Sequence, residues 1–297
     1  MPPVLMDTQG IHEQAHLVYL QWQDLYNEEK PFQVFANIPE GSTERLTNLV
    51  FGAGPLIKIN DLRGNEDNFT LDGNGFKVIQ DKLPDDFNLK SRECMGTEVV
   101  PYLEDLIRRN VEGADFVRCM DWGFRRNVEM SQSRMDVNDN MQILNPGRQV
   151  HCDQSPKGAL GRLHQHAPEM AELAKRGRLR IINLWRPLNH PVKDNSLTLC
   201  DGSTIKASDL VEADHISRTY IGNTMYGLFS PNHKWYYLHH QTPEEVFLFK
   251  IFDSDPDVAA KCSLHAAFDY SNVSDDSIPR ESMEVRFLVV TLPTKDT

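Results

Sequence analysis

A histidine and an aspartate two residues apart, His151 and Asp153, are the side chains whose types and spacing point most directly to chemistry. In an extended strand, residues i and i+2 point to the same face, so the imidazole and the carboxylate would lie side by side. With a histidine from a distant part of the chain, they would form the 2-His-1-carboxylate triad that holds Fe(II) and leaves other metal positions open. Alone, the pair equally fits a half-buried strand with a surface aspartate, so the rest of the chain must supply a third donor.

The third donor is expected to be a histidine on a later strand. The available residues are His190, His215, His233, His239, His240 and His265. His265 lies in a short apolar segment, residues 263–268, where the small Ala266 and Ala267 leave room for a metal and its ligands. We predict that His265 completes the triad, because a pair of residues suited to binding a carboxylate follows it.

That pair is Arg280 and Ser282, which share one face of the strand predicted over residues 279–290. A guanidinium binds a carboxylate through two charge-assisted hydrogen bonds, and a serine hydroxyl adds a third. The order His-x-Asp, His, Arg-x-Ser is therefore what a 2-oxoglutarate oxygenase needs. Arg286 lies on the same face and is a second candidate for this role.

Arg186 is a further candidate for binding a carboxylate of the cosubstrate or substrate, and a structural ion pair is the alternative for it. It lies in a strand predicted over residues 180–188. Alternation along that strand places Arg186 on the same face as Ile182 and Leu184, and Asn183 and Trp185 on the other.

Composition limits the class of protein. The chain has 297 residues, 40% of them hydrophobic, and a net charge of −12, which argues against binding to nucleic acid or to an anionic membrane. The cysteines, which are widely spaced, are Cys94, Cys119, Cys152, Cys200 and Cys262. This odd number does not indicate a disulfide framework. With no signal peptide and no long apolar run, the sequence predicts a cytoplasmic protein that does not enter a membrane.

The elements that must position these residues are mostly short strands. Residues 96–297 show many strands separated by Pro, Gly, Asn and Asp turns, which favours a barrel or sandwich over alternating βαβ units. Helices are predicted after Pro101 and over residues 168–177. Hairpin turns are predicted at residues 52–55 and 72–75. We expect a single domain over 1–297, in which residues 1–95 form an N-terminal arm that covers the substrate.

Six segments together resemble the fungal gibberellin-desaturase-like family, whose members are hydroxylases and desaturases of secondary metabolism. They are residues 151–155 (HCDQS), 183–188 (NLWRPL), 197–201 (LTLCD), 233–237 (HKWYY), 249–254 (FKIFDS) and 279–286 (PRESMEVR). The resemblance covers roughly residues 100–297, and the combination is much more specific than any one segment.

The resemblance implies a mainly β fold with flanking helices around a double-stranded β-helix, or jelly-roll, core. It implies Fe(II), 2-oxoglutarate and O2 as cofactors, with His151, Asp153 and His265 as iron ligands and Arg280 and Ser282 as the cosubstrate anchor. The partner would be a small-molecule substrate that is hydroxylated or desaturated. An N-terminal arm of this kind is also compatible with a homodimer.

Two other functions fit parts of the sequence. A non-catalytic jelly-roll binding protein would share the fold. A methyltransferase or methoxylation component could use Gly52 and Gly54 to bind S-adenosylmethionine, but the third glycine and the following helix of that fingerprint are missing. The sequence identifies neither the substrate nor the outcome of the oxidation.

Overall fold

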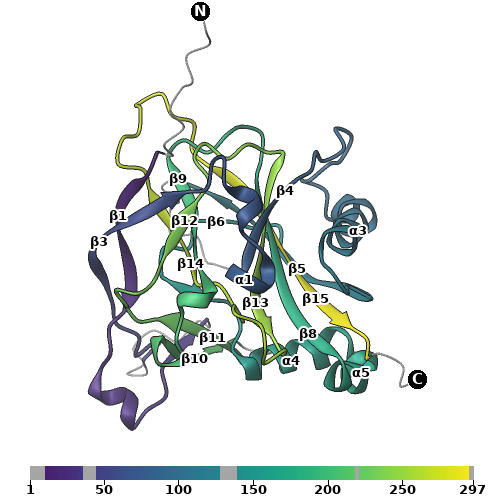
Figure 1. Cartoon of the computed structure of the whole chain (residues 1–297), viewed down its shortest axis with the longest axis horizontal. Coiled ribbons are helices and arrows are strands. Elements are labelled where there is room, and N and C mark those ends of the chain that lie inside the picture. The colour runs from purple at the N-terminus through teal and green to yellow at the C-terminus, as the bar shows by residue number, and fades with distance from the viewer. Residues whose placement is uncertain (1–10, 36–44, 128–138, 218–220, 294–297) are drawn as a thin grey trace, which may run out of the picture.

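A nine-stranded and a six-stranded β-sheet form most of the molecule in the computed structural model (Figure 1). The structure describes residues 11–35, 45–127, 139–217 and 221–293. The nine-stranded sheet contains, in spatial order, β1 (Glu13–Leu20), β3 (Phe51–Asp61), β12 (Trp235–Tyr237), β9 (Asn195–Cys200), β14 (His265–Asp269), β7 (His151–Cys152), β11 (Ile221–Gly227), β10 (Leu210–Ile216) and β2 (Phe32–Val34). The six-stranded sheet contains β4 (Phe76–Gln80), β13 (Glu245–Asp253), β8 (Arg178–Pro187), β15 (Glu281–Thr291), β5 (Phe116–Arg126) and β6 (Ile143–Leu144).

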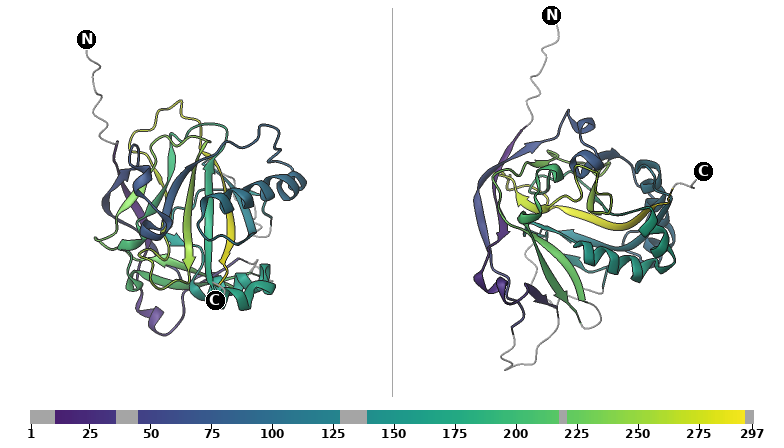
Figure 2. Two further views of the ribbon diagram at one scale, coloured as in Figure 1. Left: turned by 45° about the vertical axis from the view of Figure 1, so that its right-hand side comes forward. Right: turned by 60° about the horizontal axis from the view of Figure 1, so that its bottom comes forward.

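The two sheets face each other across a shared apolar core. Trp185 and Phe249 of the six-stranded sheet belong to the same buried cluster as Leu199 and Trp235 of the nine-stranded sheet. The long strands β13, β8, β15 and β5 pair antiparallel, and both sheets curl around the core (Figure 2). This arrangement confirms the mainly β, double-stranded β-helix fold predicted from the sequence.

The six-stranded sheet is covered on its outer face by helix α3 (Val100–Asn110), on the right in Figure 1. Leu103 and Ile107 of α3 pack with Ile182 and Leu184 of β8. Trp185, the next residue of β8, belongs instead to the core between the sheets. The alternation predicted for this strand is therefore present, and its even-numbered residues point toward α3.

The described residues of the first third of the chain contribute strands to both sheets. β1 pairs antiparallel with β3 along the edge of the nine-stranded sheet, and β4 pairs with β13 in the six-stranded sheet. Val18 of β1 also forms a bridge to Gln149, just before the His-x-Asp segment. Strand β1 thus lies beside the segment that carries His151.

The hairpin predicted at residues 52–55 is wrong, because these residues lie inside the continuous strand β3. The glycine serves close packing: a Cβ on Gly54 would lie 2.7 Å from the ring of Tyr19 on β1. The pairing between β1 and β3 shifts register between His16 and Val18, opposite this segment. A bulge at this point accommodates Pro55, which has no N–H to donate.

The predicted hairpin at residues 72–75 is instead a short helix, α1 (Leu71–Asn74), capped by the Thr70 side chain and ended by Gly75 at a φ of 85°. The remaining helices are α2 (Arg92–Cys94), α4 (Pro156–His166) and α5 (Ala171–Arg176). The sequence does not predict helix α4, because a proline such as Pro156 usually marks a break between elements. Ser155 is its N-cap, accepting a hydrogen bond from Gly158 N, and Pro156 occupies the first turn, where proline is tolerated.

None of the helices described is long and apolar enough to cross a membrane.

Candidate active site

The residues of the predicted triad, His151, Asp153 and His265, come together between the two sheets. His151 on β7 lies directly opposite His265 on β14 in the nine-stranded sheet, and their ring centroids are 4.2 Å apart. Asp153 Oδ1 is 3.3 Å from His151 Nε2 and 3.8 Å from His265 Nε2. The three ligand atoms lie within 4.8 Å of one another, which is close enough for one metal ion to bind all three.

Backbone carbonyls set which ring nitrogen of each histidine is free to bind a metal. His151 Nδ1 lies 2.7 Å from the carbonyl oxygen of Gln149, and His265 Nδ1 lies 3.4 Å from that of Ser263. Each Nδ1–H can donate to its carbonyl, which leaves the lone pair on Nε2, the nitrogen that faces Asp153. Such hydrogen bonds fix the tautomer and orientation of metal-ligating histidines.

The local electrostatics keep the donor groups in the protonation states that a metal needs. Burial, together with the charge of His151, lowers the pKa of His265 to about 3, so its imidazole is neutral at pH 7. Burial opposes ionisation of Asp153, but Arg286 and His151 outweigh it and hold the pKa of this carboxyl well below its usual range. A neutral imidazole and an ionised carboxylate are the metal-binding forms.

The second oxygen of Asp153 is held by the opposite sheet. Arg286 Nε on β15 donates to Asp153 Oδ2 at 2.7 Å, and Asn183 Nδ2 on β8 donates to the same oxygen at 2.8 Å. Arg286 itself is fixed by Asp121 Oδ1 at 2.9 Å and by Glu284. Oδ1 is therefore the oxygen left to face the two histidines. Sequence reasoning considered Arg286 for the cosubstrate and missed this contact.

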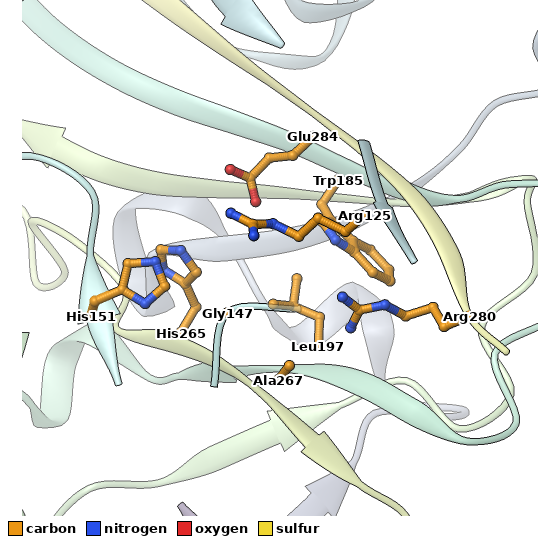
Figure 3. Close-up of a pocket in the computed structure, with 9 residues that line it drawn as sticks. All are labelled: Arg125, Gly147, His151, Trp185, Leu197, His265, Ala267, Arg280 and Glu284. Atoms are coloured by element: carbon orange, nitrogen blue, oxygen red, sulfur yellow. The ribbon is translucent and has the colours of Figure 1, made fainter. Parts of the chain in front are cut away.

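A cavity of about 290 Å³ extends from the two histidines into the space between the sheets (Figure 3). It is lined by Arg125, Gly147, His151, Trp185, Leu197, His265, Ala267, Arg280 and Glu284. Arg280 and the two histidines thus line the same cavity.

Comparisons with known proteins agree with this geometry. Residues 17–290 match a family described as "Oxidoreductase/YMDC permease-like domain". The Fe(II)/2-oxoglutarate-dependent dioxygenase nvfI of Aspergillus novofumigatus is 32% identical over 240 residues, which cover 78% of this chain and 82% of that protein. The hydroxylase/desaturase efuI of Hormonema carpetanum is 32% identical over 267 residues, covering 82% of this chain and 85% of that protein.

A solved structure shows the same likeness. The iron and alpha-ketoglutarate-dependent endoperoxidase NvfI superposes with a TM-score of 0.80 at 26% identity, covering 95% of this chain and 98% of that chain. The chain belongs to this family of fungal Fe(II)/2-oxoglutarate-dependent dioxygenases and hydroxylase/desaturases.

Two buried polar groups of this dioxygenase fit the distal carboxylate of 2-oxoglutarate. Arg280 and Ser282 are 2% and 1% exposed, and neither Arg280 Nε nor Ser282 Oγ has a hydrogen-bond partner among the described residues. Leaving buried donors unpaired costs roughly 1–3 kcal/mol each, more when charged. A carboxylate between them would satisfy both. The Arg280 guanidinium also lies over the ring of Trp185, at 5.5 Å from its centroid.

The prediction that Arg186 binds the cosubstrate is corrected by the structure. Its guanidinium lies on the outer side of the six-stranded sheet, where Nη1 donates to Asp81 Oδ2 at 2.8 Å. Nη2 donates to the carbonyl oxygens of Asp81 and Pro243. Arg186 is therefore a buried structural ion pair, the alternative that the sequence had left open.

The other candidate histidines lie outside the triad. His215 Nε2 is 3.0 Å from the Tyr226 hydroxyl, and His233 Nε2 is 3.1 Å from Asp209. His239 and His240 stack on each other, with ring centroids 3.8 Å apart. The glycines considered for S-adenosylmethionine, Gly52 and Gly54, lie within strand β3 and form no loop that could cradle a ligand.

Proposed function

We propose that this enzyme oxidises a C–H bond of a small-molecule secondary metabolite, by hydroxylation or desaturation. His151, Asp153 and His265 would hold Fe(II), and Arg280 with Ser282 would hold 2-oxoglutarate. The observation that carries the proposal is one cavity, lined at one end by the two histidines of the three-donor metal group and at the other by Arg280, a buried cation with an unpaired donor.

Within this proposal, each group of residues has a separate task. Arg286 and Asn183 orient Asp153, while the carbonyls of Gln149 and Ser263 orient the two histidines. Arg280 and Ser282 fix the far end of the cosubstrate, and Trp185 packs against the arginine. When bound, Fe(II) with 2-oxoglutarate and O2 supplies the oxidising chemistry, coupled to decarboxylation of the cosubstrate to succinate.

A second cavity provides space for the substrate. It encloses about 600 Å³ and is lined by Gln14, Ala15, His16, Val18, Leu56, Arg148, Ala267, Phe268 and Asp269. Ala267 lines both cavities, so the two share a wall. The charges of Arg148 and Asp269 are paired with each other at 2.6 Å. With that pair neutralised, the lining suits an uncharged substrate that carries both polar and apolar groups. The lining residues from β1 and β3 support a substrate-covering role for the N-terminal third.

Anaerobic titration with Fe(II) and 2-oxoglutarate tests the proposal. We expect the weak visible charge-transfer band of the chelated cosubstrate in the wild type and its loss in His265→Ala, because a ligand to the metal is removed. His233→Ala, which removes a histidine paired with Asp209 away from the triad, should keep the band.

A band of wild-type intensity in His265→Ala would remove His265 from the metal site. An iron-loaded wild type without the band would contradict the cosubstrate assignment of Arg280 and Ser282, and would favour a non-catalytic binding protein.

A further inference from the structure

A second arginine of the cavity, Arg125, has no role in the function proposed above. It lies on β5, and its Cα is directly opposite that of Ser282 on β15. In Figure 3, Arg125 and Arg280 both direct their guanidinium groups toward the two histidines. The cavity is therefore lined by two cationic side chains as well as by the metal-binding group.

The charge of Arg125 is not neutralised within the described part of the chain. Its Nη1 donates to the carbonyl oxygen of Asn145 at 2.7 Å, and none of the ion pairs between described residues includes it. The carboxylate of Glu284 lines the same cavity, but that group is paired with Arg286. Arg125 thus presents a guanidinium with free donors to the cavity.

Two guanidinium groups facing one small cavity favour a ligand with two negative groups. Burial lowers the pKa of Arg280 to about 9, and the nearby charge of Arg125 contributes to this shift. Like charges in a partly desolvated space are stabilised when an anion lies between them. A ligand with two carboxylates could place one of them against each arginine.

We propose that Arg125 is a second cosubstrate-binding residue, which contacts the carboxylate next to the keto group of 2-oxoglutarate. Arg280 and Ser282 contact the other carboxylate. This inference rests on the proposed function. It follows from the position of the Arg125 guanidinium, which in the view of Figure 3 lies closer to the two histidines than the Arg280 guanidinium does. That is the end of the cavity where the metal-chelating end of the cosubstrate would lie.

Comparing the binding of two ligands tests which carboxylate each arginine contacts. 2-Oxopentanoate has the same chain length as 2-oxoglutarate and keeps its keto acid end, but lacks the distal carboxylate. We would measure binding of both acids by calorimetry to protein loaded with Mn(II), which requires no turnover. Arg125→Met should weaken the binding of both acids by a similar factor, about 10-fold or more for a lost charged hydrogen bond. Arg280→Met should weaken the binding of 2-oxoglutarate alone.

Arg126→Met is the matched control. Arg126 is the next residue of β5, is exposed, and pairs with Glu281 at 3.1 Å. Removing its charge should leave the affinity for both acids unchanged. Arg125→Lys keeps the charge but not the planar fork, and should bind both acids with intermediate affinity. If Arg125→Met does not fold, Arg125→Lys provides the test in its place.

Unchanged affinity for both acids in both Arg125 variants would overturn the inference and leave the proposed function in place, with Arg125 then facing the substrate. Loss of affinity for 2-oxoglutarate alone would overturn it too, because it would assign Arg125 to the distal carboxylate. A Mn(II)-loaded wild type that binds neither acid would overturn the proposed function itself.

Discussion

At the scale of single residues, the contact between Arg286 and Asp153 predicts how metal affinity responds to substitution. Arg286→Lys keeps the positive charge but cannot reach Asp153, Asp121 and Glu284 together as the guanidinium does. Losing such an outer contact typically costs metal sites about 10–100-fold in affinity. We expect about a 10-fold loss for Mn(II), measured by calorimetry.

Arg180→Lys is the control for this prediction. Arg180 is also a buried arginine of the six-stranded sheet, but its Nη2 donates to Gly113 O and Thr291 Oγ1, away from the metal group. This variant should lose stability without losing metal affinity. Wild-type affinity in Arg286→Lys would mean that charge alone matters at this position.

The sequence predicted the donor atoms better than the groups that hold them. His151, Asp153 and His265 could be proposed because their types and order are specific. The role of Arg286 could not, because its partner Asp153 lies 133 residues away and meets it only across two sheets. Arg186 shows the converse. Alternation separates it from Asn183 and Trp185 on the two faces of β8, but only the structure shows which of these faces lines the cavity.

At the scale of elements, Gly54 is a point of close packing between strands β1 and β3. A Cβ there would lie 2.7 Å from the ring of Tyr19, which is fully buried. Gly54→Ala should therefore lower the free energy of unfolding by about 1–3 kcal/mol, the usual cost of overpacking. Urea denaturation measures this.

Gly123 of β5 offers a matched substitution, since a Cβ there would have no atom within 4 Å. Gly123→Ala should leave stability nearly unchanged. Equal effects of the two substitutions would show that strand propensity, and not the Tyr19 contact, decides the cost.

The errors at this scale have a common physical cause. Gly and Pro usually mark turns and the ends of elements, but the structure that forms around them depends on what packs beside them. In β3, glycine permits close contact with Tyr19 and Pro55 lies at a bulge, so no turn forms. At α4, Pro156 begins a helix after the Ser155 cap. The local sequence does not show which residues will pack there. It therefore predicts a turn within β3 and fails to predict α4.

At the scale of the whole molecule, the site depends on both sheets being in place. The histidines belong to the nine-stranded sheet, whereas Asn183, Ser282 and Arg286 belong to the six-stranded sheet. The N-terminal strands β1 and β4 pair into one sheet each. We infer that the chain folds as one unit, and that its stability reflects groups buried across this whole arrangement.

Acid sensitivity follows from a half-buried group, His215 of β10. Burial, aided by the charge of His151, lowers the pKa of His215 from 6.5 to about 4. Between these values the unfolded chain binds more protons than the folded protein, so the free energy of unfolding falls as the pH decreases through this window. His265, with a pKa of about 3, acts in the same direction.

His215→Gln should make this dependence shallower, by up to about 1.4 kcal/mol per pH unit for one proton. Urea unfolding of the metal-free protein, repeated across the window from 6.5 to about 4, measures the slope. His164→Gln replaces an exposed histidine on α4 and should leave the slope as in the wild type. A wild-type slope in His215→Gln as well would mean that His215 takes up its proton without unfolding, so that β10 opens locally in acid while the two sheets stay folded.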